Sequence, residues 1–145
     1  MIVCLDTNAL LQLFGRRSPY QPILRAVVAG LPTLAVSTPM LLEYEEVAPE
    51  LYGAEFWREA VTFLHFATLA GQVRHITPRF RFRLIAADPD DDAFADCAIT
   101  ADAEFILTED RHFEVLRQAG YRPAHHARGV CRPRAAPAGW HLTGS

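Results

Sequence analysis

The chain has 145 residues, half of them hydrophobic and 21% charged, with a formal net charge of −3. This composition favours a single soluble domain with a sizeable core and excludes a largely disordered protein. The longest apolar runs are far shorter than the roughly 20 residues of a membrane helix, and Asp6 comes too early for a signal peptide. We therefore expect a cytoplasmic protein that does not enter a membrane.

The charge is distributed unevenly along the chain. Residues 1–121 carry all 17 acidic residues and 10 of the 14 arginines, whereas residues 122–145 carry four arginines and no acid. An acidic body argues against binding of duplex nucleic acid through a broad basic surface, but it leaves open a substrate bound through metal ions. The three cysteines form no C-x-x-C pair, so neither a disulfide framework nor a zinc site is favoured.

Short apolar runs alternate with amphipathic segments over the first 119 residues. The runs predict buried strands at residues 2–5, 33–37, 73–76 and 104–107. Apolar residues at helical spacing predict helices at residues 10–14, 22–29, 54–69, 90–101 and 112–119. A further helix is expected after residue 37, with Thr38 as its cap, Pro39 at its first position, and Pro49 ending it or marking a new turn. Four alternations of strand and helix predict an α/β domain with a parallel sheet.

Two segments do not fit this alternation. Residues 77–89 have no helical period and contain Arg79, Arg81 and Arg83 interleaved with two phenylalanines, so we expect an extended segment or a loop. These arginines would contact RNA phosphates while the aromatic rings stack on bases, or else the alternation marks an edge segment with one apolar face. Residues 122–145 are rich in Arg, Ala and Pro, which predicts a basic, loosely ordered tail without a packed element.

Four acidic residues fall where the ligands of a parallel sheet collect, at the carboxyl ends of its strands. Asp6 ends the first strand, Glu43 lies one turn into the helix after the second, Asp91 opens the helix before the fourth, and Asp110 follows the fourth. Each like-charge pair at about 4 Å costs roughly 1–4 kcal/mol. We therefore expect a bound cation to offset the repulsion among these carboxylates. Oxygen ligands suit Mg²⁺ or Mn²⁺, and the absence of His and Cys at the four positions disfavours zinc.

The same positions carry a family resemblance. Residues 5–11 (LDTNALL), 37–47 (STPMLLEYEEV), 88–98 (DPDDDAFADCA) and 105–113 (FILTEDRHF) together resemble the PIN domain, a PilT N-terminus-like nuclease, and in particular the toxin PIN group of toxin–antitoxin systems. The resemblance covers residues 1–120. It implies a single three-layer α/β/α domain at residues 1–121 with a central parallel sheet of four or five strands.

The function that the resemblance implies is cleavage of single-stranded RNA by a metal-dependent endoribonuclease. The acidic quartet Asp6, Glu43, Asp91 and Asp110 would be catalytic and would bind one or two Mg²⁺ or Mn²⁺ ions. Asp91 is chosen over its two acidic neighbours because it stands seven residues before Ala98, as in the family.

The resemblance also implies supporting residues and partners. Thr7, Asn8 and Thr108 would orient the carboxylates and the metal-bound waters. Glu109 departs from the family, which often has Gly there, and adds charge beside Asp110. The implied partners are single-stranded RNA and a cognate antitoxin protein, with a homodimer left open.

Each candidate also has a simpler interpretation. Asp6 alone is compatible with a turn or a helix cap, Glu43 with an exposed helical glutamate, and residues 90–92 with an N-cap cluster. Asp96 and Glu46 would either extend the site or lie on a solvated helix face, and for His112 a helix-start or surface position is favoured over catalysis.

Two rival functions are considered. A phosphatase of the haloacid dehalogenase type needs a second aspartate two residues after Asp6, where this chain has Asn8. A degenerate PIN domain would serve as a non-catalytic scaffold that binds RNA or a partner protein. The retained acidic quartet argues against such a loss of activity.

Overall fold

The computed structural model describes residues 1–15, 17–18, 20–86, 88–108, 110–118 and 124–126. Its centre is a parallel sheet with the strand order β3-β2-β1-β4-β5. The strands are β1 (Ile2–Leu5), β2 (Thr33–Val36), β3 (Val73–His75), β4 (Phe105–Leu107) and β5 (Ala124–His126). The first four lie within a residue or two of the runs that predicted them, because buried parallel strands read as continuous apolar segments.

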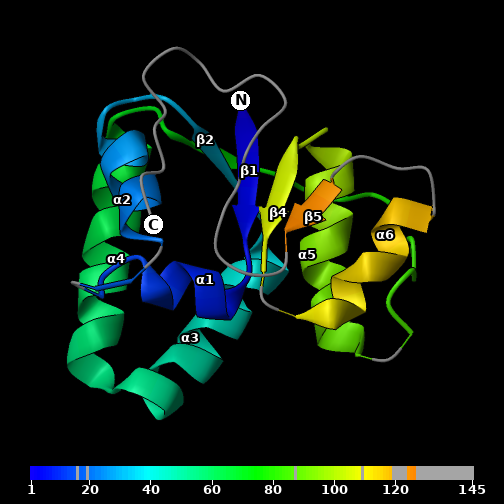
Figure 1. Ribbon diagram of the computed structural model, residues 1–145, viewed down its shortest axis with the longest axis horizontal. Helices are drawn as coiled ribbons and strands as arrows, with labels where there is room; N and C mark the ends of the chain where they lie inside the picture. The colour runs from blue at the N-terminus through cyan, green and yellow to red at the C-terminus, as the bar shows by residue number, and fades with distance from the viewer. Residues whose placement is uncertain (16, 19, 87, 109, 119–123, 127–145) are drawn as a thin grey trace.

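Helices cover both faces of this sheet. They are α1 (Thr7–Gln12), α2 (Gln21–Val28), α3 (Thr38–Tyr52), α4 (Ala54–Leu69), α5 (Pro89–Thr100), the 3₁₀ helix η1 (Arg111–Glu114) and α6 (Val115–Gln118). Figure 1 shows α1 to α4 on one side of the sheet and α5 with α6 on the other. The three-layer α/β/α architecture with a parallel sheet is thereby confirmed. Among the described residues, no helix combines the length and the apolar character that a membrane crossing requires.

The start and the end of α3 differ from the expectation. Ser37, not Thr38, caps the helix, since its backbone is extended and its Oγ accepts a hydrogen bond from the Met40 amide at 3.4 Å. Pro49 does not end the helix: it lies inside α3, which continues to Tyr52 and stops at Gly53. Gly53 has a φ of +90°, a conformation that side chains resist, so the glycine is the stronger stop signal.

The last strand is a second correction. No packed element was expected beyond residue 121, yet β5 pairs in parallel with β4 over residues 124–126. Parallel pairing uses backbone groups, so a three-residue edge strand leaves little trace in a sequence. The rest of the expected basic tail, residues 127–145, lies outside the described residues.

The core runs along β1 and fixes the position of its carboxyl end. Val3, Cys4 and Leu5 are buried, and Tyr44 from α3 donates its hydroxyl hydrogen to the carbonyl oxygen of Leu5. Burial raises the pKa of Tyr44 well above its ordinary value, which keeps this donor protonated. Cys4 and Cys97 are buried free thiols, as expected for small hydrophobic residues. The core packing of β1 and the hydrogen bond from α3 together fix the position of Asp6, the residue that follows Leu5.

Candidate active site

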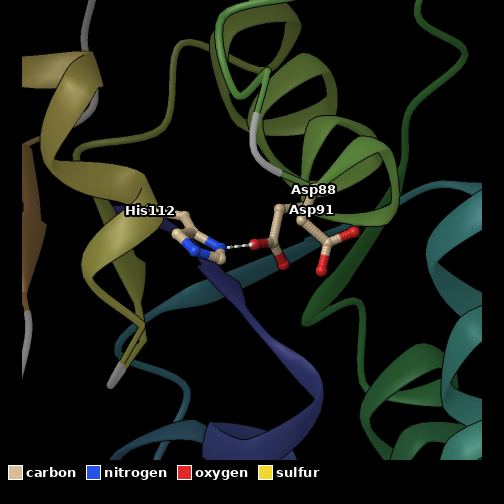
Figure 2. A group of neighbouring side chains, drawn as sticks. All are labelled: Asp88, Asp91 and His112. Carbon is tan, nitrogen blue, oxygen red and sulfur yellow. Dashed lines mark hydrogen bonds and ion pairs between the residues drawn. The ribbon is translucent and has the colours of Figure 1, made fainter.

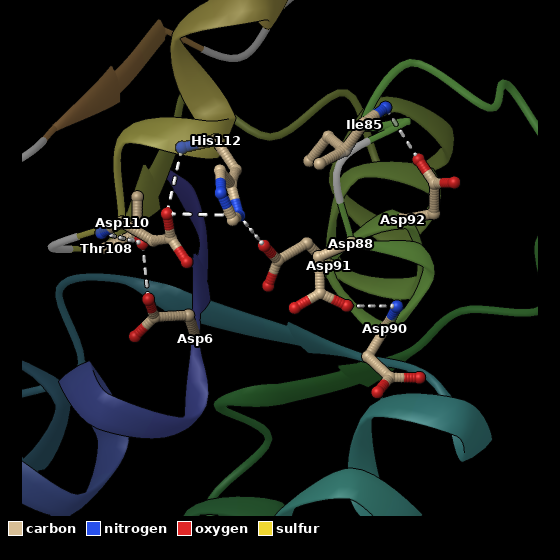
Figure 3. A network of polar contacts seen from close by, with 9 residues as sticks. All are labelled: Asp6, Ile85, Asp88, Asp90, Asp91, Asp92, Thr108, Asp110 and His112. Atoms are coloured by element: carbon tan, nitrogen blue, oxygen red, sulfur yellow. Dashed lines mark hydrogen bonds and ion pairs between the residues drawn. The ribbon is translucent and has the colours of Figure 1, made fainter.

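Acidic side chains from three elements meet at the carboxyl edge of the sheet (Figure 3). Asp6 follows β1, Asp110 lies between β4 and η1, and Asp88 and Asp91 stand at the start of α5. Each aspartate occupies a strand end or a helix start, where backbone amides converge. The fold thus brings three of the four predicted quartet residues to one edge.

Asp6 is buried and serves as both a helix cap and a member of this cluster. Its side chain is only 6% exposed, and its Oδ1 accepts from the Ala9 amide at 2.7 Å, which caps α1. Its Oδ2 accepts from the hydroxyl of Thr108, whose Oγ1 in turn accepts from the Asp110 amide at 2.9 Å. Thr108 therefore links the Asp6 carboxylate to the Asp110 backbone. Thr7 is buried and Asn8 exposed on the first turn of α1.

Asp88, Asp91 and His112 form the tightest group. One potential ligand atom from each lies within 4.8 Å of the others, and no other trio of His, Cys, Asp or Glu among the described residues comes this close. Figure 2 shows the His112 ring of η1 pointing at the two aspartates of α5. The Nδ1 atom of His112 lies 3.1 Å from the Asp91 Oδ2 and 3.4 Å from the Asp110 Oδ1. Asp6 and Glu43 lie outside this group.

The electrostatics of the group favour a cation. Burial raises the pKa of the half-buried Asp91 to about 6, nearby Asp110 and Asp88 add to the rise, and the hydrogen bond from His112 opposes it. The same hydrogen bond raises the pKa of His112. Two carboxylates and an imidazole are a donor set that a divalent ion fits, and the ion would neutralise their repulsion. In the sequence, the absence of His and Cys at the four predicted positions disfavoured zinc. His112 adds a nitrogen donor, so that argument does not apply to this group.

Glu43 lies beside this group and lines a pocket of about 690 Å³. Partial burial raises the pKa of Glu43, and Asp90, Glu46, Asp88 and Asp91 contribute to the rise in that order. The same pocket is lined by Arg81 and Arg83, but not by Arg79. The pocket therefore brings Glu43 together with two of the three arginines that were expected to contact RNA.

Two residues of this site were missed or discounted from the sequence. Asp88 precedes Pro89 and caps α5, and it stands three residues before Asp91, the N-cap to N3 spacing at which two side chains lie close together. That spacing was available in the sequence. His112 was assigned to the surface, and it is exposed, but the fold places it 3.1 Å from an acid 21 residues away. No local pattern predicts such a contact.

Two further expectations are settled by burial. Asp96 is 7% exposed, so it does not lie on a solvated helix face. Phe80 is 74% exposed while Phe82 is half-buried, so the two rings do not share one buried apolar face.

The family model of the PIN domain matches residues 2–112. The chain belongs to the PIN-domain family. PIN domains are generally nucleases. No curated protein matches the chain.

Two solved structures resemble this PIN domain in fold. One is VapBC2 from Rickettsia felis, bound to a DNA fragment from the promoter of VapBC2. Its TM-score is 0.52 and its sequence identity 18%, and the match covers 79% of this chain and 92% of that chain. VapBC-1 from nontypeable Haemophilus influenzae has a TM-score of 0.52 and 18% identity over 87% of this chain and 97% of its own. At this level of identity the likeness concerns the fold.

Proposed function

We propose that this PIN domain is a Mg²⁺- or Mn²⁺-dependent endoribonuclease that cleaves single-stranded RNA in the cytoplasm. The observation that carries the proposal is the meeting of Asp6, Asp110 and the Asp88–Asp91–His112 group at one edge, next to a pocket with two arginines. Acidic edges of this kind hold the divalent ions that many phosphodiester hydrolases use.

Different side chains would bind the metal, position it and bind the RNA. Asp6, Asp91 and Asp110 would hold the metal, and Glu43, on the pocket wall, would bind a second ion or position the attacking water. Thr108 fixes the directions of Asp6 and of the Asp110 backbone through its hydroxyl. Arg81 and Arg83 would bind phosphates of the RNA strand. When bound, the metal supplies a lowered water pKa and stabilises charge on the phosphate.

Cleavage assays test the assignment. Wild-type protein with Mg²⁺ or Mn²⁺ should cut a labelled single-stranded RNA, and EDTA should stop the reaction. Asp6→Asn and Asp91→Asn keep the side-chain shape but remove a charge, so each should lower kcat/KM more than about 100-fold, since residues that only support ligands already cost 10–100-fold. Glu55→Gln, at the exposed start of α4, is the matched control.

Three results contradict parts of the proposal. If both Asn variants cut at wild-type rates, either the quartet is wrong or a contaminating nuclease is responsible, and metal titrations of the variants separate the two. Metal binding without cleavage of any single-stranded RNA in a panel indicates a non-catalytic scaffold. Equal cleavage of duplex RNA overturns the single-strand preference.

We further propose that the chain is the toxin of a toxin–antitoxin pair and binds a cognate antitoxin. The support is the shared fold with two VapBC structures together with the family membership. Induced expression of the wild-type chain in bacteria should arrest growth, and Asp6→Asn should relieve the arrest at an equal protein level. Co-expression of the product of an adjacent small gene should restore growth and yield a stable complex in gel filtration.

A further inference from the structure

Helix α5 presents aspartates on two different faces. Asp88 and Asp91, three residues apart, face His112. Asp92 and Asp96, four residues apart, lie on another face and contact the segment before the helix. Figure 3 shows the Asp92 side chain directed away from His112 and toward Ile85. The second pair therefore has a role other than joining the Asp88–Asp91–His112 group.

The segment that this second pair contacts, residues 78–86, has no helix or strand, and we call it the strap. Asp96 Oδ1 accepts from the Phe82 amide at 2.9 Å, and Asp92 Oδ1 accepts from the Ile85 amide at 2.9 Å. Asp96 is almost fully buried, and the Ile85 side chain is buried in the core. Two carboxylates thus hold the backbone of the strap on α5, in place of the ladder that a strand would supply.

The two hydrogen bonds flank a strained residue. Arg83 has a φ of +51°, in the left-handed region that is unfavourable for a residue with a side chain. The Phe82 and Ile85 amides lie on either side of it in the chain, so both hydrogen bonds oppose relaxation of this conformation. The two hydrogen bonds therefore hold the strap in this strained shape.

The shape of the strap determines which of its side chains line the pocket. Phe80, Arg81 and Arg83 line the pocket, and all three are exposed. The same pocket is lined by Glu43 and by Asp90, which precedes Asp91 of the acidic edge in the chain. An exposed aromatic ring beside two guanidinium groups suits an unpaired base followed by its phosphate, because the ring stacks and the arginines pair with oxygens.

We propose that Asp92 and Asp96 are positioning residues that hold the strap so that Phe80, Arg81 and Arg83 grip a single-stranded RNA next to the acidic edge. The proposal rests on the ribonuclease function given above. Burial raises the pKa of Asp96, while the Phe82 hydrogen bond and the Arg81 charge oppose the rise. Arg81 thus lies within electrostatic reach of the carboxylate that anchors its neighbour.

Paired substitutions at the two anchors test this role. Asp92→Ala and Asp96→Ala remove the acceptor oxygens, whereas Asp92→Asn and Asp96→Asn keep an acceptor for the same amides. Hydrogen exchange should accelerate at the Ile85 amide in Asp92→Ala and at the Phe82 amide in Asp96→Ala. In both variants, trypsin should cleave faster after Arg81 or Arg83. KM for single-stranded RNA should rise about five- to tenfold, the effect of one lost hydrogen bond, while kcat and Mn²⁺ affinity stay at the wild-type level. The Asn variants should resemble wild type.

The outcomes separate this role from others. A fall in kcat together with weaker Mn²⁺ binding would show that Asp92 and Asp96 act as metal ligands and would overturn the proposal. Unchanged amide exchange and KM in both Ala variants would overturn it as well. A wild-type protein that neither cuts RNA nor binds an uncleavable 2′-O-methyl strand refutes the ribonuclease function, whereas amide exchange still reports whether the anchors hold the strap. Glu55→Ala is the control for a lost surface acid.

Discussion

The two halves of the acidic edge are held in different ways. Asp6 and Asp110, at the ends of β1 and β4, are joined through the hydroxyl of the buried Thr108. Asp88 and Asp91, at the start of α5, are half-buried near each other and face a single counter-charge, His112. The Asp6 carboxylate and the Asp110 backbone are thus oriented before any ion binds. At the helix start, His112 offsets the repulsion between the carboxylates only in part, since the pKa of Asp91 is still raised, and an ion would remove the rest.

The largest difference between the halves should appear on removal of the Thr108 hydroxyl. Thr108→Val has nearly the same shape but leaves Asp6 without this donor and the Asp110 amide without its acceptor. Cleavage should fall about 10–100-fold, and the free energy of unfolding should fall by about 1–3 kcal/mol. Thr108→Ser keeps the hydroxyl and should retain most of both. Steady-state kinetics and urea unfolding measure the two effects, and equal behaviour of Val and Ser would contradict the link.

Asp88→Asn should reverse the sign of the stability effect. In EDTA this variant should be as stable as wild type or more stable, because one of two repelling charges is gone and Asn still caps α5. Saturating Mn²⁺ at a hundredfold excess over Kd should stabilise wild type by about 2.7 kcal/mol. The variant should need about tenfold more Mn²⁺ for the same stabilisation. Thermal melts across a Mn²⁺ titration measure this, and a destabilised variant in EDTA would show that the Asp88 charge stabilises the start of α5 more than it repels its neighbours.

The features of this site differ in whether the sequence alone could predict them. The positions of the first four strands and the place of Asp6 and Asp110 follow from apolar runs with an acid one to three residues after them, since such runs are local. The contacts of His112 with Asp91 and of Asp96 with Phe82 join residues 21 and 14 positions apart, so no local period reveals them. Ser37 and Thr38 are both good caps, and only the backbone geometry chooses between them.

The smallest expected effect is a pH dependence of metal binding that comes from the helix-start half. The pKa of Asp91 is raised to about 6 in the folded chain, above the value of about 3.8 for an unperturbed group, so the folded state holds this proton more tightly. Its contribution to stability is therefore fully present below about pH 3.8 and is lost as the pH rises through about 6. A metal ion must displace the same proton, and a protonated His112 would repel the ion.

Mn²⁺ should consequently bind about tenfold more weakly at pH 5 than at pH 7.5, because only about a tenth of Asp91 is ionised one unit below its pKa. Isothermal titration at the two pH values measures this ratio. In Thr108→Ser the ratio should be unchanged, since that substitution leaves the groups around Asp91 in place. A pH-independent affinity in wild type would mean that Asp91 does not bind the ion, and the metal would then belong to the strand-end half alone.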